Sequence, residues 1–78
     1  MGALYLTLTK SYKAENPMGG EIFLDVKDYH LTDDFLHIDH RVLTKDCMVV
    51  EMTTTIARRY IVDIRAFVNA RDLNNYLG

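Results

Sequence analysis

The chain has 78 residues and a formal net charge of −2, with charged residues at 26% and hydrophobic residues at 49%. This length allows a single domain over residues 1–78, and the composition is that of a globular rather than a disordered protein. A pI near 5.8 excludes a strongly basic nucleic-acid-binding protein. The single cysteine, Cys47, excludes an intrachain disulfide and a cluster of thiolate metal ligands.

Targeting signals are not expected in this chain. Residues 1–7 lack the basic start and the long apolar core of a secretory signal. No apolar run approaches the roughly 20 residues that a membrane-spanning helix needs. We therefore expect a cytoplasmic protein with no membrane contact, which for a viral protein means the cytoplasm of the host cell.

Alternation of apolar and polar residues predicts four β-strands. They cover residues 3–10, 21–29, 35–42 and 46–53. The side chains expected to face the core include Leu4, Leu6, Leu8, Met48, Val50 and Met52. Residues 11–20 contain the only proline and a Gly-Gly pair, so this stretch is predicted to be a loop.

Charge decides the expected pairing of the second and third strands. A three-residue loop over residues 32–34 places Asp25 opposite Arg41, with Asp34 in the left-handed conformation that such loops require. A register shifted by two would place Asp25 opposite Asp39, where like charges repel. The first register is therefore predicted.

Residues 56–68 have two interpretations. A helix would place seven apolar residues on one face: Ile56, Ala57, Tyr60, Ile61, Ile64, Phe67 and Val68. A strand would leave Arg58 facing inward and Ile61 and Phe67 facing outward, so a helix fits better, although its β-branched residues weaken it. Thr54 or Thr55 would serve as the N-cap, and a break near Asn69 would precede a separate terminal turn.

Together these elements predict an α+β fold. We expect a four-stranded antiparallel sheet with one C-terminal amphipathic helix packed on one face. The alternative is an all-β small barrel with a short C-terminal helix.

No catalytic, metal or cofactor site is predicted. His37 and Asp39 share one strand face, but His30 and His40 do not converge with them, and zinc needs three or four converging ligands. Motifs typical of nucleotide-binding loops, serine hydrolases and zinc proteases do not occur. We therefore expect a protein that is not an enzyme and carries no cofactor.

The sheet face turned away from the predicted helix carries the most informative residues. The register pairs Tyr29 with His37, and one helix cannot cover both faces of a sheet. The exposed set would be Tyr5, Phe23, Tyr29, Phe35 and His37. Because soluble monomers seldom expose contiguous apolar patches, this face predicts a protein-binding or regulatory protein that acts as a homodimer. Such a size would suit an accessory factor or inhibitor from a virus or mobile element.

Arginines of the predicted helix support a second hypothesis. Arg58, Arg59 and Arg65 would lie on its solvent face, where they could contact nucleic-acid phosphates or an acidic protein. The alternative function is therefore a small nucleic-acid-binding regulator. The net acidity of the chain makes it the less favoured of the two.

Overall fold

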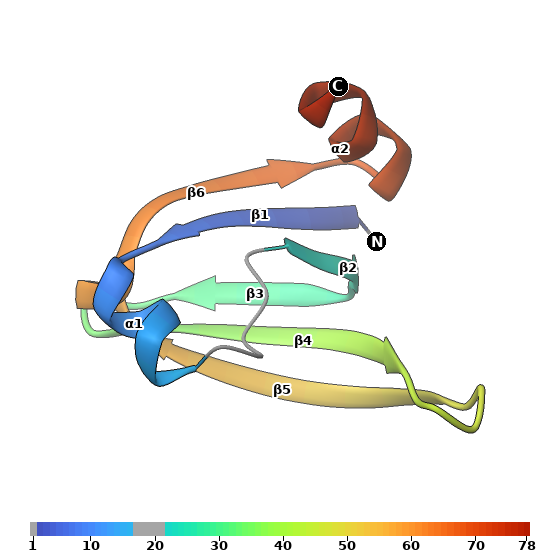
Figure 1. Ribbon diagram of the computed structural model, residues 1–78, viewed down its shortest axis with the longest axis horizontal. Helices are drawn as coiled ribbons and strands as arrows, with labels where there is room; N and C mark the ends of the chain where they lie inside the picture. Colours follow the sequence, from blue (N-terminus) through green and yellow to red (C-terminus); the bar gives the residue numbers. More distant parts are fainter. Residues whose placement is uncertain (1, 17–21) are drawn as a thin grey trace.

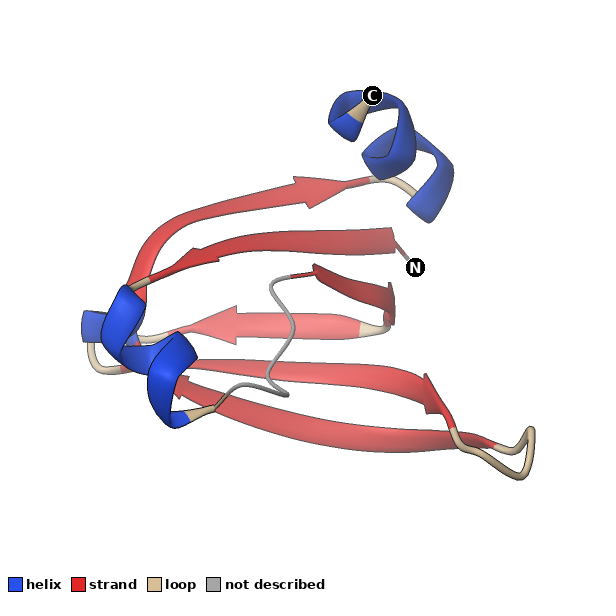
Figure 2. Cartoon of the chain, in the orientation of Figure 1, coloured by secondary structure: helices blue, strands red, loops and turns tan. Residues whose placement is uncertain are grey.

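The computed structural model describes residues 2–16 and 22–78. Its elements in chain order are β1 (Gly2–Leu8), α1 (Lys10–Glu15), β2 (Ile22–Val26), β3 (Asp28–Leu31), β4 (Phe35–Leu43), β5 (Val49–Ala57), the 3₁₀ turn η1 (Arg58–Tyr60), β6 (Ile61–Phe67) and α2 (Ala70–Leu77). The strands form two antiparallel three-stranded sheets, ordered β2-β1-β6 and β3-β4-β5 (Figure 1). The fold is therefore α+β. The predicted single four-stranded sheet is wrong, and the described strands do not close into a barrel (Figure 2).

One hydrophobic core joins the two sheets. Its buried members are Leu4, Leu6, Leu8, Val26, Leu36, Ile38 and Ile56. The first sheet supplies β1 and β2 side chains to this core, and the second supplies those of β4 and β5. The alternation predicted for β1 is confirmed, because all three of its inward leucines are at most 4% exposed.

The second predicted strand is two strands, and this division produces the two sheets. Asp25 has a positive φ of 55°, and the chain bends between β2, which pairs with β1, and β3, which pairs with β4. At the bend, the Lys27 amide donates to the Asp39 carbonyl oxygen at 2.8 Å. A strand that bends from one sheet into another makes a corner between them.

The turn between β3 and β4 differs by one residue from the predicted register. Tyr29 lies opposite Ile38 and Asp28 lies opposite Asp39. The Thr32 amide donates to the Phe35 carbonyl oxygen at 2.8 Å, so only two residues remain in the turn. Apposed carboxylates are tolerated because each accepts another hydrogen bond, from the Tyr29 amide and from the Thr53 hydroxyl.

The predicted pairing of the third and fourth strands is confirmed as antiparallel, from Phe35 opposite Ala57 to Leu43 opposite Val49. Val50 and Met52 take the predicted inward side of the sheet, opposite Val42 and His40. The prediction that they and Met48 belong to the core is wrong, because Met48, Val50 and Met52 are 62%, 40% and 47% exposed. The reason is position, since the β4–β5 hairpin projects beyond the other strands (Figure 1).

The helix predicted over residues 56–68 is wrong. Ile56 and Ala57 end β5, and residues 61–67 form β6, which pairs along the whole of β1 after Gly2. The turn η1 inserts three residues between the strands and shifts the phase of their alternation. Apolar residues of two strands therefore fall at helical spacing. Neither Thr54 nor Thr55 caps a helix, since both lie in β5.

The predicted break near Asn69 is confirmed. The Asn69 side chain caps α2 by accepting from the Asp72 amide at 2.9 Å. This short helix packs on the outward side of β1, where Ala3 is 2% exposed and Leu73 is fully buried. Tyr76 adds an edge-to-face contact with Tyr5 at 6.3 Å between ring centroids.

The predicted loop over residues 11–20 is wrong in its first half. Residues 10–15 form α1, whose N-cap Thr9 accepts from the Tyr12 amide. Tyr12 packs against the core and lies 5.5 Å from the Tyr60 ring, and this contact supports so short a helix. Residues 17–20 of that prediction lie outside the described residues.

Candidate functional site

The side of the β3-β4-β5 sheet that points away from the core is the candidate site, and we call it the outer face. Strand alternation defines it, because inward residues of β4 and β5 alternate with outward ones. β3 supplies Asp28 and His30 to it, opposite Asp39 and His37. Its side chains from the other two strands are Phe35, His37, Asp39, Arg41 and Leu43 from β4, and Val49, Glu51, Thr53, Thr55 and Ala57 from β5. These ten residues form five directly opposed pairs.

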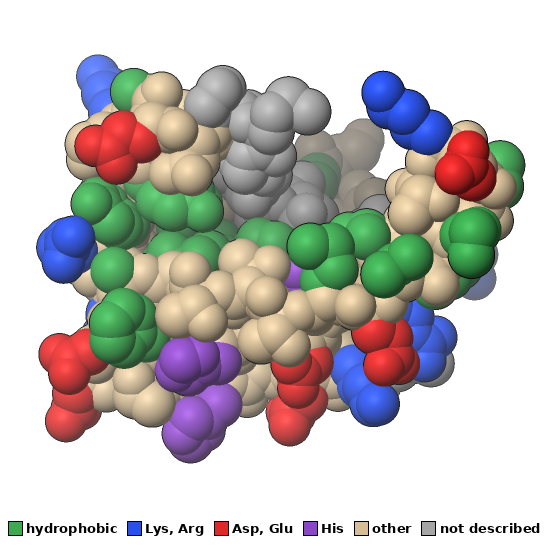
Figure 3. All heavy atoms as spheres, turned by 90° about the horizontal axis from the view of Figure 1, so that it is seen from below, with side chains coloured by type: hydrophobic (Ala, Val, Ile, Leu, Met, Phe, Trp, Pro, Cys, Tyr) green, Lys and Arg blue, Asp and Glu red, His purple; other side chains and the backbone are tan. Residues whose placement is uncertain are grey.

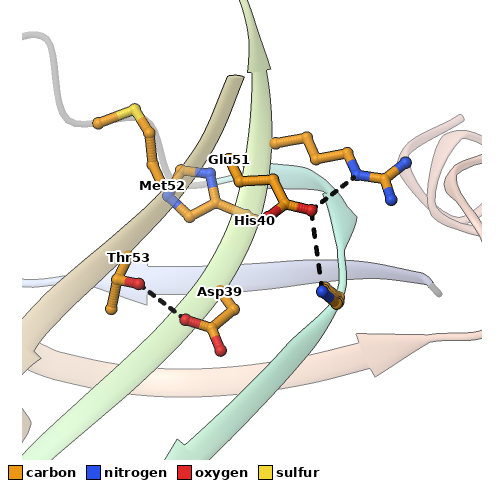
Figure 4. Close-up of a pocket in the computed structure, with 7 residues that line it drawn as sticks. Asp39, His40, Glu51, Met52 and Thr53 are labelled. Atoms are coloured by element: carbon orange, nitrogen blue, oxygen red, sulfur yellow. Dashed lines mark hydrogen bonds and ion pairs between the residues drawn. The ribbon is translucent and has the colours of Figure 1, made fainter. Parts of the chain in front are cut away.

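The three central pairs are polar and bonded across the strands. His37 Nδ1 lies 3.1 Å from Thr55 Oγ1. The Thr53 hydroxyl donates to Asp39 Oδ1 at 2.8 Å (Figure 4). Such bonds hold each polar side chain in one orientation on an exposed surface.

Next along the strands is a charged group. Glu51 Oε1 lies 4.0 Å from Arg41 Nε and 3.8 Å from Lys27 Nζ. A hollow of about 350 Å³ lies among these residues, and its lining comprises Lys27, Asp39, His40, Arg41, Glu51, Met52 and Thr53. Because two cations and two carboxylates line it, the hollow has no net charge to select an anion or a cation.

The two end pairs of the outer face are apolar. Leu43 and Val49 at the hairpin end are 71% and 65% exposed, and Phe35 at the other end is 45% exposed. Met48, at 62%, extends the hairpin end. Seen from below, hydrophobic side chains form a broken band across the molecule, with histidine side chains gathered below it and charged side chains on both sides (Figure 3).

Behind the outer face lies one buried polar residue. His40 is 6% exposed, and its Nε2 lies 2.6 Å from Thr54 Oγ1. The Phe23 ring stands edge-on to the imidazole at 5.1 Å. The imidazole and hydroxyl of this inward pair are therefore bonded to each other, with His40 buried and Thr54 partly buried.

The structure brings together only two of the five aromatic-face residues predicted from sequence. Phe35 and His37 are neighbours on the outer face, with ring centroids 6.1 Å apart. Tyr5 lies against α2, and Phe23 packs against the core. Tyr29 is turned to the inward side of the sheet by the one-residue register difference, because a slip of one residue exchanges strand faces.

The three arginines do not lie on one helix. The Arg58 amide donates to the Asp34 carbonyl oxygen at 2.8 Å, and its Nη1 donates to the Thr32 carbonyl oxygen at 3.1 Å. Arg59 stands over the Tyr60 ring at 4.7 Å. Arg58 therefore ties η1 to the β3–β4 turn.

Arg65 lies in β6 and is directed toward α2. It stands 5.3 Å from the Tyr76 ring centroid and donates from Nε to Asp63 Oδ2 at 3.0 Å. The guanidinium holds the pKa of the Asp63 carboxyl below its ordinary value of 3.8. The arginine cluster imagined for nucleic-acid binding therefore has no common helical surface.

No group of three or more His, Cys, Asp or Glu side chains that could hold a metal ion occurs in the described part of the chain. Cys47 is exposed in the β4–β5 turn, with φ of 61°. Over the same residues, neither helix is long and apolar enough to cross a bilayer.

The residues missed from sequence are mostly those on β5. Glu51 and Thr53 lie within the predicted fourth strand but were given no role, and Thr55 becomes a partner of β4 only because the strand continues to Ala57. The run of three threonines at residues 53–55 was the available signal, since β-branched residues favour strands. His30, which was not expected to converge with His37, lies directly opposite it in β3.

No protein-family model matches the chain, and neither the curated proteins nor the solved structures contain a significant match.

Proposed function

We propose that the protein is a small binding or regulatory protein without enzymatic activity, which acts by protein–protein contact as a homodimer. The observation that carries this proposal is the exposed apolar end of the β4–β5 hairpin, formed by Leu43, Met48 and Val49. Exposed apolar patches rimmed by polar groups are typical of interaction sites. The polar pairs of the outer face supply such a rim.

The small size of the chain supports association. A domain of this length buries only about 60% of the surface that its unfolded chain exposes. A two-fold dimer is the commonest oligomer and would add burial on both copies. An accessory or inhibitory role in a virus or mobile element, within the cytoplasm, fits such a protein.

The outer face supports binding better than catalysis. Its histidine, carboxylate and hydroxyl groups are each bonded to a neighbour across the strands. Its apolar side chains lie at the two ends of this polar centre, where Phe35, Leu43 and Val49 are exposed and available to a partner.

The test is the mass of the unmodified protein by light scattering over a range of concentrations. We expect a mass twice the 9.0 kDa of the chain at micromolar concentration. Replacing Leu43 and Met48 with aspartate should lower that mass toward the single chain. Val68→Asp, a change at a residue 77% exposed in the link between β6 and α2, should not. A mass of one chain at every concentration would contradict the homodimer.

A further inference from the structure

The free edge of β5 is the longest unpaired strand edge in the described part of the molecule. Within the β3-β4-β5 order, β5 has nine residues and pairs on one side only, with β4. It contains no proline or lysine and one charged residue, Glu51. Edge strands normally carry such residues because they prevent pairing with another chain.

The edge of the other sheet is protected by comparison. β6 has seven residues, and two of them, Asp63 and Arg65, form an ion pair beside the chain's own C-terminal helix. Charges on an edge strand oppose its pairing with another strand. Of the two edges, β5 is therefore the one suited to accept a further strand.

The sequence of β5 is complementary to itself in one antiparallel register. With Thr53 on the two-fold axis, all nine residues pair, and inward residues meet inward residues. Val49 meets Ala57 of the partner subunit, and Val50 meets Ile56 of the partner subunit. Glu51 meets Thr55 of the partner subunit, so the single carboxylate avoids its own copy.

This register also continues the rows of side chains already present across β4 and β5. On the outer face, the apolar pair of Leu43 and Val49 would run into the partner's Ala57 and the partner's Phe35. On the inward side, Val42 and Val50 would run into the partner's Ile56 and the partner's Leu36. Apolar rows meet apolar rows, and hydroxyl groups meet at the centre, both of which stabilise strand pairs.

Neighbouring registers lose this match. With Glu51 on the axis, two carboxylates would face each other, which is destabilising. With Met52 on the axis, only residues 49–55 overlap, and Val49 would meet a threonine in place of an alanine.

We propose that a second copy of this chain pairs antiparallel along β5, with Thr53 on the two-fold axis, to form one six-stranded sheet. The inference rests on the homodimer of the proposed function and specifies its geometry. The interface buries the half-exposed Val50 and Met52, at 40% and 47%, together with the backbone groups of the edge.

Cross-linking at the axis tests this geometry. Thr53→Cys in a Cys47→Ser background places two thiols opposite each other, within reach of a disulfide or a short bis-thiol reagent. We expect most of the chain to become a covalent dimer under mild oxidation. The matched control is Val62→Cys in the same background, at a residue 65% exposed on β6, which should remain almost entirely monomeric on a denaturing gel.

Charge at the axis provides a second measurement. Thr53→Lys places two cations opposite each other and should raise the dissociation constant of the dimer at least about tenfold. Thr53→Val removes the same hydrogen bond to Asp39 but adds no charge, and should leave a dimer. Circular dichroism of each variant shows whether the fold is retained.

The two proposals fail in different ways. If the unmodified protein has the mass of one chain, the homodimer itself is wrong. If its mass is that of two chains but Thr53→Cys does not cross-link above the Val62→Cys control and folded Thr53→Lys stays dimeric, the dimer stands and β5 pairing is overturned. Preferential cross-linking of Met52→Cys over Thr53→Cys would overturn the register.

Discussion

The two sheets differ in what covers the side turned away from the core. On β2-β1-β6 the chain's own α2 covers that side, with Leu73 fully buried and Ala3 2% exposed beneath it. On β3-β4-β5 the outer face is open, and Phe35 and Leu43 remain 45% and 71% exposed. One sheet is thus covered within the chain, whereas the other retains exposed apolar side chains.

Residue size accounts for part of this difference. Ala3 leaves room for a helix to approach β1, and Tyr5 and Phe67 provide rings for Tyr76. On β4 the corresponding outward positions carry His37, Asp39 and Arg41, whose polar groups would lose water under a helix. The contacts that these polar groups make across the strands allow the side chains to remain exposed to water.

Weakening the packing of α2 on the β2-β1-β6 sheet should have the largest effect on the free energy of unfolding. Leu73→Ala deletes a fully buried side chain between α2 and β1, and such changes cost about 2–5 kcal/mol of unfolding free energy. Urea denaturation measures the loss. Leu77→Ala, at a residue 48% exposed on the same helix, is the control and should cost clearly less. Equal losses would mean that α2 does not cover the sheet.

The two sides of β5 should respond differently to the same chemical change. Thr54→Val removes the inward hydroxyl and leaves Nε2 of buried His40 without its 2.6 Å partner, at a cost of about 1–3 kcal/mol. Thr53→Val removes an outward hydroxyl whose partner Asp39 can bond water instead, and should cost less than about 1 kcal/mol. Thermal denaturation at low protein concentration compares the two. A larger loss at Thr53 would reverse the assignment of faces.

The ion pairs of the outer face should contribute little to the stability of the protein. Glu51 contacts Lys27 and Arg41, but the Glu51 and Lys27 side chains are 64% and 60% exposed. Glu51→Gln should therefore lower stability by less than about 1 kcal/mol. The difference from the unmodified protein should vanish in 1 M salt, where screening acts over about 3 Å. A difference that persists at high salt would indicate a role other than charge pairing.

The smallest effect on stability is expected from a substitution of Asp63, which lies in β6 of the sheet that α2 covers. Its folded-state pKa is lowered, chiefly by the hydrogen bond from Arg65. The stabilisation is therefore present above the ordinary value of 3.8 and is lost as the pH falls through the lower folded value. Asp63→Asn should slightly flatten the acid limb of the melting temperature against pH and leave the values near neutrality almost unchanged. An unchanged acid limb would mean that the pair contributes nothing.

Prediction from sequence succeeded where local pattern and packing agree. The inward leucines of β1 followed from alternation, since a strand exchanges faces at every residue. The antiparallel β4–β5 pairing followed from the short connection between the two strands. The break near Asn69 was predicted because the apolar residues beyond Val68 leave the face of the predicted helix. Phe35 and His37 were placed together because they are two residues apart on one strand.

Prediction failed where the phase of alternation changed. At Asp25 a bend carries the strand into the other sheet, and at η1 a three-residue turn joins two strands, so that a period of two resembled a helix. In the β3–β4 turn, Arg58 from a distant segment binds both Thr32 and Asp34. No local pattern reports such long-range contacts.

The sequence by itself determined an α+β chain with alternating strands, a break near Asn69 and more apolar surface than one short helix can cover. These properties depend on side-chain periodicity and on residues near each other in the chain. Tertiary structure alone decided which sheet α2 covers, which residues share the outer face and which strand edge is left unpaired. Those outcomes depend on contacts between distant segments, since a shift of one residue in register exchanges every outward side chain for an inward one.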